Sequence, residues 1–190
     1  MLKKMKYINI TIIAIMCLCL CGCGITDKIF GRDYENVVKK YINAYSDLEE
    51  DDVIDILKLL PPGGKDFVLE ESEEQLGALD ETELAEYVEK RGESLQEILN
   101  TEDNAEFSYE ILEEEELVTV ELRDFSEELQ SSGIEIGTPD AGVKAEVNVY
   151  EKDDDSNDIE MELLLLKIDG KWYLWNTDAL TCEGFSISMY

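Results

Sequence analysis

The sequence predicts an α+β fold in which N-terminal helices pack on a curved antiparallel sheet. From residue 33 to residue 99 the apolar residues recur at helical spacing, whereas from residue 105 they alternate with polar residues, as in half-buried strands. The dipeptide Asp169-Gly170 also separates two apolar segments, which is typical of a two-residue β-hairpin turn. Helices first and hairpin-linked strands afterwards indicate one α+β domain over residues 33–190.

The first predicted helix follows Asp33, which suits the N-cap position. One apolar stripe runs along it at the spacing i, i+3, i+4, i+7, i+8 and i+11: Tyr34, Val37, Val38, Tyr41, Ile42 and Tyr45. A second helix is predicted over residues 51–60, because Pro61-Pro62-Gly63-Gly64 cannot continue it. Residues 66–75 fit either a helix or a loop.

A third helix is predicted over residues 81–99, where the apolar residues keep helical spacing. Asp80 precedes Glu83 by three residues, as in a capping box at the start of a helix. After this helix the period changes to two. Residues 107–111 and 118–122 both alternate, so they are predicted to form a hairpin whose turn is the Glu113–Glu116 run.

A polar segment over residues 124–142, with several glycines and a proline, is predicted to lead to a third strand at 143–149. The fourth strand, 159–168, contains four consecutive leucines and is therefore apolar on both faces. We expect this strand to be central in the sheet and covered on each side. After the Asp-Gly turn a further strand is predicted at 171–176, and the alternation of Phe185, Ile187 and Met189 predicts an edge strand.

Charge excludes one class of partner. The 190 residues include 16 Lys and Arg against 46 Asp and Glu, a net charge of −30, and an acidic surface of this kind repels nucleic acid. There is no His, which removes Ser-His-Asp and Cys-His catalytic sites and His-containing zinc sites. Hydrophobic residues make up 44% of the chain, so we expect a folded domain rather than an acidic disordered tail.

Residues 1–23 have the layout of a secretory signal peptide. Lysines at positions 3, 4 and 6 precede an apolar stretch from Ile8 to Leu20, which ends at Leu20-Cys21-Gly22-Cys23. A membrane-spanning helix needs about 20 apolar residues, and this stretch is shorter. Cleavage of the segment, as in an exported protein, therefore fits better than an uncleaved anchor.

The segment Leu20-Cys21-Gly22-Cys23 resembles the lipobox of bacterial lipoproteins. Leu20 occupies position −3, Gly22 occupies position −1, and Cys23 would become the new N-terminus. The resemblance implies attachment of a diacylglyceryl group to the Cys23 thiol, cleavage after residue 22, and a short lipidated linker over residues 23–32. It also implies an extracytoplasmic protein anchored to the bacterial cell membrane by this lipid. An ordinary secreted protein cut near Gly24 is the alternative.

Once the signal is removed, only Cys23 and Cys182 remain, so a lipidated Cys23 leaves Cys182 without a disulfide partner. We expect Cys182 to act as a small buried hydrophobic residue rather than as a reactive thiol. The chain that remains has 13 basic and 46 acidic residues, a net charge of −33.

With helices followed by a meander, and with Gly170-Lys171-Trp172-Tyr173-Leu174 opening a late strand, the chain resembles the nuclear-transport-factor-2-like, cystatin-like superfamily. The resemblance implies helices that close one side of a sheet into a cone. In that superfamily the cone holds a small ligand, a catalytic site or only a packed core.

Six aromatic residues are the candidate lining of such a cone: Tyr34, Tyr41, Tyr45, Tyr109, Trp172 and Trp175. Buried Tyr and Trp bring apolar surface and a polar group to a ligand pocket. The alternative is that they fill the core between helices and sheet, since an aromatic stripe at helical spacing is typical of a core.

The acidic segment from Asp153 to Asp158 suggests weak calcium binding through Asp153, Asp155 and Asn157, because calcium takes several oxygen ligands. It lacks the glycine and the final glutamate of an EF-hand loop, so a solvated hairpin turn is the simpler interpretation. We expect no cofactor.

These features predict a non-catalytic lipoprotein that binds a small molecule or a protein partner, in addition to the membrane that holds its lipid. The alternatives are a small enzyme using carboxylates and Tyr in the same fold, which would need an inward-facing acid with a raised pKa, and a structural acidic surface protein. The strand positions Val118, Val120, Val147 and Val149 are predicted to face the core, and they offer no such acid.

Overall fold

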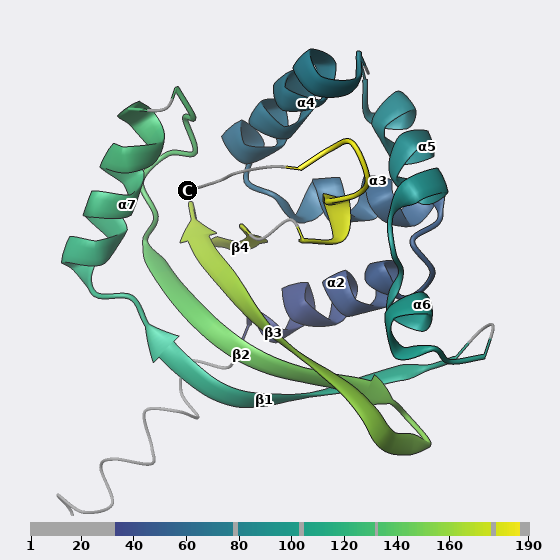
Figure 1. The fold of residues 1–190 in the computed structure, drawn as a ribbon. Helices are drawn as coiled ribbons and strands as arrows, with labels where there is room; N and C mark the ends of the chain where they lie inside the picture. The colour runs from purple at the N-terminus through teal and green to yellow at the C-terminus, as the bar shows by residue number, and fades with distance from the viewer. Residues whose placement is uncertain (1–32, 78–79, 103–104, 132, 176–177, 187–190) are drawn as a thin grey trace, which may run out of the picture. The chain divides into compact units, whose positions relative to one another are not determined.

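The computed structural model describes residues 33–77, 80–102, 105–131, 133–175 and 178–186, and residues 34–190 form one compact unit. The predicted signal peptide, lipobox and linker lie outside the described residues. The α+β arrangement predicted from the sequence is confirmed (Figure 1). Its elements are α2 (Glu35–Asp47), α3 (Glu50–Leu59), α4 (Pro62–Leu76), α5 (Glu81–Arg91), α6 (Leu95–Leu99), β1 (Phe107–Glu116), α7 (Thr119–Ser131), β2 (Ala141–Glu151), β3 (Asp154–Ile168), β4 (Lys171–Leu174) and the 3₁₀ turn η2 (Asp178–Leu180).

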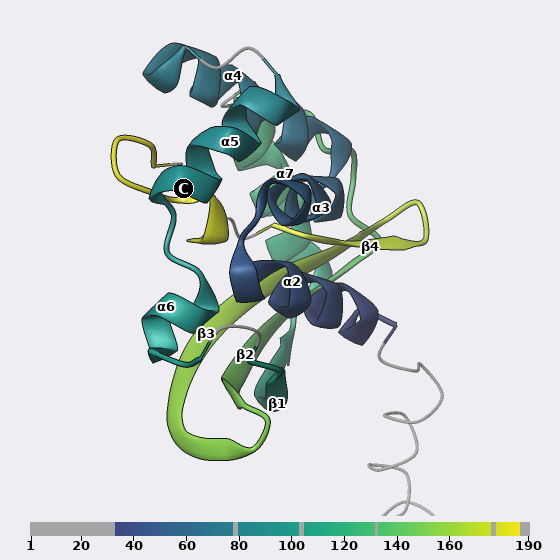
Figure 2. The same ribbon diagram turned by 90° about the vertical axis from the view of Figure 1, so that its right-hand side faces the viewer.

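The four strands form one antiparallel sheet in the order β1-β2-β3-β4. The sheet curves, and α2 crosses one of its faces (Figure 2). Along β2 the alternate residues Val143, Ala145, Val147 and Val149 are all buried on that inner face, as predicted. The turn between β3 and β4 is Asp169-Gly170, and both residues have positive φ (51° and 77°), which a type I′ turn requires.

Each face of β3 faces a different hydrophobic core. Leu163 and Leu165 belong to the main core, which lies between the inner face of the sheet and helices α2, α3 and α5. Leu164 and Leu166 belong to a second core beneath α7. The prediction that β3 is central and covered on both sides is therefore confirmed.

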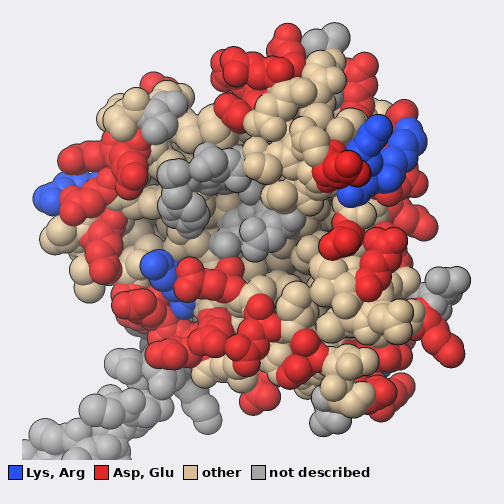
Figure 3. Space-filling model, in the orientation of Figure 1, with Lys and Arg blue, Asp and Glu red and all other residues tan. Residues whose placement is uncertain are grey.

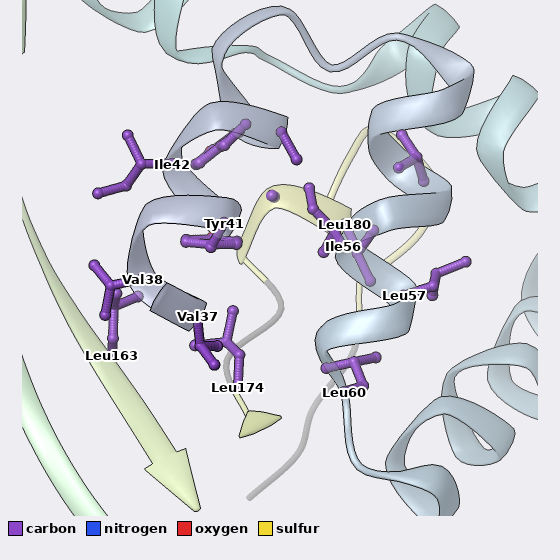
Figure 4. Packing of buried hydrophobic residues seen from close by; sticks show 14 of the residues in the cluster. Val37, Val38, Tyr41, Ile42, Ile56, Leu57, Leu60, Leu163, Leu174 and Leu180 are labelled. Carbon is purple, nitrogen blue, oxygen red and sulfur yellow. The ribbon is translucent and has the colours of Figure 1, made fainter. Parts of the chain in front are cut away.

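The predicted stripe of the first helix, from Tyr34 to Tyr45, is buried in the main core (Figure 4). The N-cap of α2 is Tyr34 rather than Asp33. Val38 and Tyr41 are at most 1% exposed. Val38 lies toward the sheet, and Tyr41 lies toward α3. The long stripe buries one continuous side of the helix, which explains why its spacing was readable in the sequence.

The Pro-Pro-Gly-Gly segment ends α3, as predicted, but it also begins α4, since Pro62 takes the first helical position. Residues 66–75, which the sequence left open, are helical. Gly63 and Gly64 allow close packing at the start of α4. A Cβ on Gly63 would overlap the carbonyl oxygen of Glu135, and one on Gly64 would lie 2.9 Å from Cζ3 of Trp175.

The prediction of one helix over residues 81–99 is wrong, because the chain forms two helices, α5 and α6. The start is as predicted: the Asp80 carboxylate accepts a hydrogen bond of 2.9 Å from the Glu83 N–H. The break follows Gly92, where a Cβ would lie 2.7 Å from a methyl group of Leu48. Ser94 then caps α6 in a capping box with Glu97.

The predicted hairpin over residues 107–122 is also wrong. β1 runs through Glu113–Glu116, because these residues pair with β2, and the chain then turns into α7. The N–H of Val118 donates to the Glu121 carboxylate at 2.8 Å. Val118 and Val120 are 60% and 54% exposed rather than core-facing. Most of the predicted polar connection over residues 124–142 is likewise helix α7 and the second-core segment that follows it.

The last described segment, residues 181–186, lies against α4 and α5. Phe185 is 1% exposed, and its backbone bridges to Cys182. The hydroxyl of Tyr87 donates to the carbonyl of Glu183 at 3.0 Å, and the Gln75 amide exchanges two hydrogen bonds with the backbone of Ser186. The predicted edge strand is thus represented by an isolated bridge, and Ile187 and Met189 lie outside the described residues.

Candidate functional site

An open groove of about 750 Å³ lies between α2, the start of β1 and the end of β2. Ligand sites typically occupy about 300–1,000 Å³, so the groove is large enough for a ligand. Its lining comes from α2 (Lys39, Ile42, Asn43, Ser46 and Asp47), from residues 105–109 and from Tyr150 and Lys152.

The α2 wall is polar because it lies beside the buried stripe. Ile42 is 1% exposed and belongs to the main core, whereas Lys39 and Asn43 are exposed. Ser46 donates its hydroxyl to the Ile42 carbonyl at 3.1 Å, and the Asp47 carboxylate accepts a hydrogen bond from the Gln96 side chain. This wall therefore presents an ammonium group and a side-chain amide to the groove.

The β1 wall carries Tyr109, whose side chain is half-buried. Its hydroxyl donates to the Glu35 carbonyl at 3.4 Å. Burial raises the pKa of Tyr109, and the charge of Glu35 raises it further. The phenol therefore stays protonated at neutral pH and acts as a hydrogen-bond donor rather than as a base.

At the mouth of the groove Lys152 forms an ion pair with Glu106. The hydrogen bond between them lowers the pKa of the Glu106 carboxyl and raises the pKa of Lys152. Both side chains are exposed, so the pair contributes little to stability. Glu106 is therefore ionised at neutral pH, which does not suit a general acid.

The structure does not gather the six predicted pocket aromatics around one cavity: five lie in or against the main core, and Trp175 lies in the second core. Tyr34, Tyr41 and Tyr45 lie in the main core, where Tyr41 packs on Tyr45 with ring centroids 5.6 Å apart. Half-buried Trp172 contacts Tyr34 edge-on at 5.5 Å.

The remaining two aromatics lie in different places. Trp175 lies in the second core, edge-on to Phe125 at 5.5 Å. Tyr109 lines the groove. Tyr150 and Lys152 line the groove but were not predicted from the sequence. The alternation of β2 could have indicated Tyr150, because it follows buried Val149 and so points to the opposite face of the sheet.

A carboxyl group with a raised pKa occurs at Asp52, outside the groove. Burial is the main cause, and the neighbouring carboxylates of Asp47, Glu49 and Asp55 add to it, while the hydrogen bond from the Glu49 N–H lowers the pKa. Asp52 and Glu49 form the capping box of α3. Its position thus indicates a structural role at a helix start.

Of the suggested calcium ligands, Asp153 lies in the β2–β3 turn, whereas Asp155 and Asn157 lie at the start of β3, so the turn is shorter than the predicted one. Asp153 and Asn157 are exposed, and the side chain of Asp155 is outside the described part. The carboxylate of Asp154 accepts a hydrogen bond of 2.9 Å from the Ser156 N–H, which lowers its pKa. Across the described side chains, no group of three or more Cys, Asp or Glu is arranged to hold a metal ion.

Cys182 is half-buried and packs against the main core. Burial raises the pKa of its thiol, and the charge of Arg91 offsets part of this effect. A protonated, partly covered thiol is a poor nucleophile.

Among the helices that the structure describes, none is both long enough and apolar enough to cross a membrane. No protein-family model, curated protein or solved structure matches the chain. The lipobox and the cone-like superfamily resemblance therefore stay predictions.

Proposed function

We propose that the protein is an extracytoplasmic lipoprotein, anchored by a lipid on Cys23, whose domain over residues 33–190 is a non-catalytic binding module. The observation that carries the anchor is the order of features in residues 1–23: lysines, an apolar stretch, and Leu20-Cys21-Gly22-Cys23. We assign ligand binding to the groove between α2 and β1.

Three features support a binding role for the groove. Its lining includes half-buried Phe107 and the polar groups of Asn43 and Tyr109, so it offers both apolar contact and hydrogen-bond partners. Its tyrosine is a protonated donor, and its Glu106 carboxyl is ionised and paired. These states suit recognition better than proton transfer.

Anchoring is tested with a Cys23→Ala variant in the original host. We expect it to lose incorporation of labelled palmitate and to leave the membrane fraction. Cys21→Ala is the matched control, because it removes a thiol two residues away and keeps the lipobox. Membrane retention of Cys23→Ala, together with an unlabelled wild type, would overturn the anchor.

Binding is tested by native mass spectrometry of the full chain released from detergent micelles, compared with the denatured chain. An extra mass that disappears on denaturation, and that an Asn43→Trp variant loses, would place a bound molecule in the groove. Glu74→Trp on exposed α4 is the control substitution. An extra mass that both variants keep would assign binding to another site.

A further inference from the structure

We propose that the groove and the acidic end of β1 together take an extended segment of a partner protein, basic where it meets the glutamates, which pairs as an added strand on the free edge of β1. This inference rests on the proposed function, since it names the class of ligand for the same groove. Strand addition at an open sheet edge is a recurring mode of peptide recognition, in which main-chain hydrogen bonds supply affinity and neighbouring side chains supply specificity.

The first step is the direction in which the backbone of β1 points. β1 is an edge strand, and within the described chain it pairs with β2 alone. The Lys152 N–H donates to the Glu106 carbonyl at 2.8 Å, so the Glu106 backbone faces β2. Because this direction alternates along an antiparallel strand, the N–H and C=O groups of Phe107 and Tyr109 face away from β2.

The second step is that these outward backbone groups belong to residues that line the groove. The lining includes the five consecutive residues 105–109, with α2 as the opposite wall. An added strand lies about 4.8 Å from its neighbour, and five extended residues span about 17 Å. A groove lined by this stretch of an edge strand and by α2 therefore has the length that an extended peptide of about five residues requires.

The third step is charge. Beyond the groove β1 continues with exposed glutamates at positions 110, 113, 114, 115 and 116. Red side chains predominate toward the lower left of Figure 3, where β1 ends in Figure 1. A second copy of β1 would bring further glutamates and no Lys or Arg to this edge, whereas a segment containing Lys or Arg would neutralise the charge.

The positions of the charged side chains and of the bulge along β1 distinguish a binding edge from an edge that is only protected against aggregation. Charged side chains and bulges are the usual devices that stop edge strands from aggregating. On β1 the register shifts between Ile111 and Glu113, and four of the five glutamates follow that shift. Residues 107–109 carry neither device, so the edge is open where the groove lies and protected where it does not.

The test uses the full chain in detergent micelles and a fluorescent ten-residue peptide. Its N-terminal half alternates Lys with Thr and its C-terminal half alternates Val with Thr, which places Lys beside the glutamates in an antiparallel pairing. The matched control peptide has Glu in place of Lys. We expect saturable binding of the Lys peptide and no saturable binding of the Glu peptide.

Amide hydrogen exchange then reports the geometry. Exchange at Phe107 and Tyr109 should slow in the presence of the Lys peptide, because their N–H groups become hydrogen-bonded. Exchange at Ser108 should not change, since its N–H already faces β2. The double variant Glu113→Lys, Glu116→Lys should weaken binding about tenfold, and Glu74→Lys on α4 should leave it within about twofold.

Each other outcome overturns the inference. Absence of Lys-peptide binding, or binding without protection of Phe107 and Tyr109, excludes strand addition by a basic segment. Protection that appears without peptide and grows with protein concentration assigns the edge to a second copy. If the Lys peptide fails while native mass spectrometry still finds a groove-bound small molecule, the proposed binding function stands and the peptide inference alone is wrong.

Discussion

Strands β3 and β1 belong to one sheet and are separated only by β2, yet their surroundings are opposite. The four leucines of β3 are at most 4% exposed, covered by the main core on one face and by the second core on the other. On β1, Leu112 is 47% exposed, and glutamates occupy the end of the strand. The comparison teaches that this sheet buries one strand on both faces and leaves another exposed at its edge.

A pair of leucine truncations tests the contrast between buried β3 and exposed β1 with the largest expected effect. Leu165→Ala, at a fully buried position of β3, should lower the free energy of unfolding by about 3 kcal/mol, since it removes apolar contacts and leaves a cavity. Leu112→Ala on β1 should change it by less than about 0.5 kcal/mol. Urea unfolding of the two variants checks this, and equal losses would refute the contrast.

Gly63 tests how closely α4 packs against the 134–136 segment. Gly63→Ala should destabilise the protein by about 2 kcal/mol, although alanine favours helices by about 1 kcal/mol, because the new methyl group overlaps the Glu135 carbonyl oxygen. Glu74→Ala on the same helix is the control and should have little effect. Thermal unfolding measures both variants. A stabilised Gly63→Ala variant would show that the 134–136 segment moves to accommodate the methyl group at little energetic cost.

Trp175 tests the second core in another way. Its indole is fully buried, and its Nε1–H finds no acceptor among the described residues. Trp175→Phe should therefore cost only about 1 kcal/mol, because loss of packing is partly offset by removal of an unpaired buried donor. Leu166→Ala in the same core should cost about 3 kcal/mol. A larger loss for Trp175→Phe than for Leu166→Ala would indicate an acceptor for the indole.

On the open side, charge should matter more than packing. The β1–β2 register places Glu113 opposite Glu146 and Glu115 opposite Lys144. Glu113→Lys should stabilise the protein by about 0.5 kcal/mol and Glu115→Lys should destabilise it by a similar amount. Urea unfolding at low and at high salt checks this, and the two effects should shrink together as salt screens them.

The smallest expected effect concerns pH. Burial raises the pKa of Asp52 in the folded protein, so folding disfavours its ionised form. Stability contributed at this site should fall as pH rises from the ordinary pKa of an aspartic acid through the raised pKa, and it should be constant outside that window. Asp52→Asn keeps a capping side chain and should remove this fall. An unchanged pH profile in the variant would assign the effect to other carboxyls.

The sequence was informative wherever one element buries one continuous stripe. The helix stripe from Tyr34 to Tyr45, the alternation in β2 and the leucine run of β3 were all predicted correctly, because burial fixes the period of apolar residues. The Asp169-Gly170 turn was predicted because its backbone geometry needs particular residues.

Tertiary contacts decided the elements that sequence reasoning missed. Glu113–Glu116 has the composition of a turn, but pairing with β2 extends the strand through it. Residues 118–122 alternate like a strand, yet two of their apolar residues are exposed at the start of α7. The break at Gly92 did have a local signal, the Ser94–Glu97 capping box, but the apolar spacing continues across it and predicted one helix.

The groove was not predictable for a similar reason. It joins residues of α2, β1 and β2 that are spread over positions 39 to 152, and of its lining residues only Tyr109 was among the predicted pocket aromatics. The aromatics that the sequence singled out were conspicuous because they are large. Most of them lie within the two cores instead.

The C-terminal segment has a consequence for how the helical half of the domain is closed. Phe185 is part of the main core, and Ser186 bonds to Gln75 of α4 across 111 positions of sequence. The helical half therefore cannot complete its packing from its own residues alone. A segment that follows the sheet must return to the helices, and the entropy of closing so long a loop must be lost before these contacts stabilise the fold.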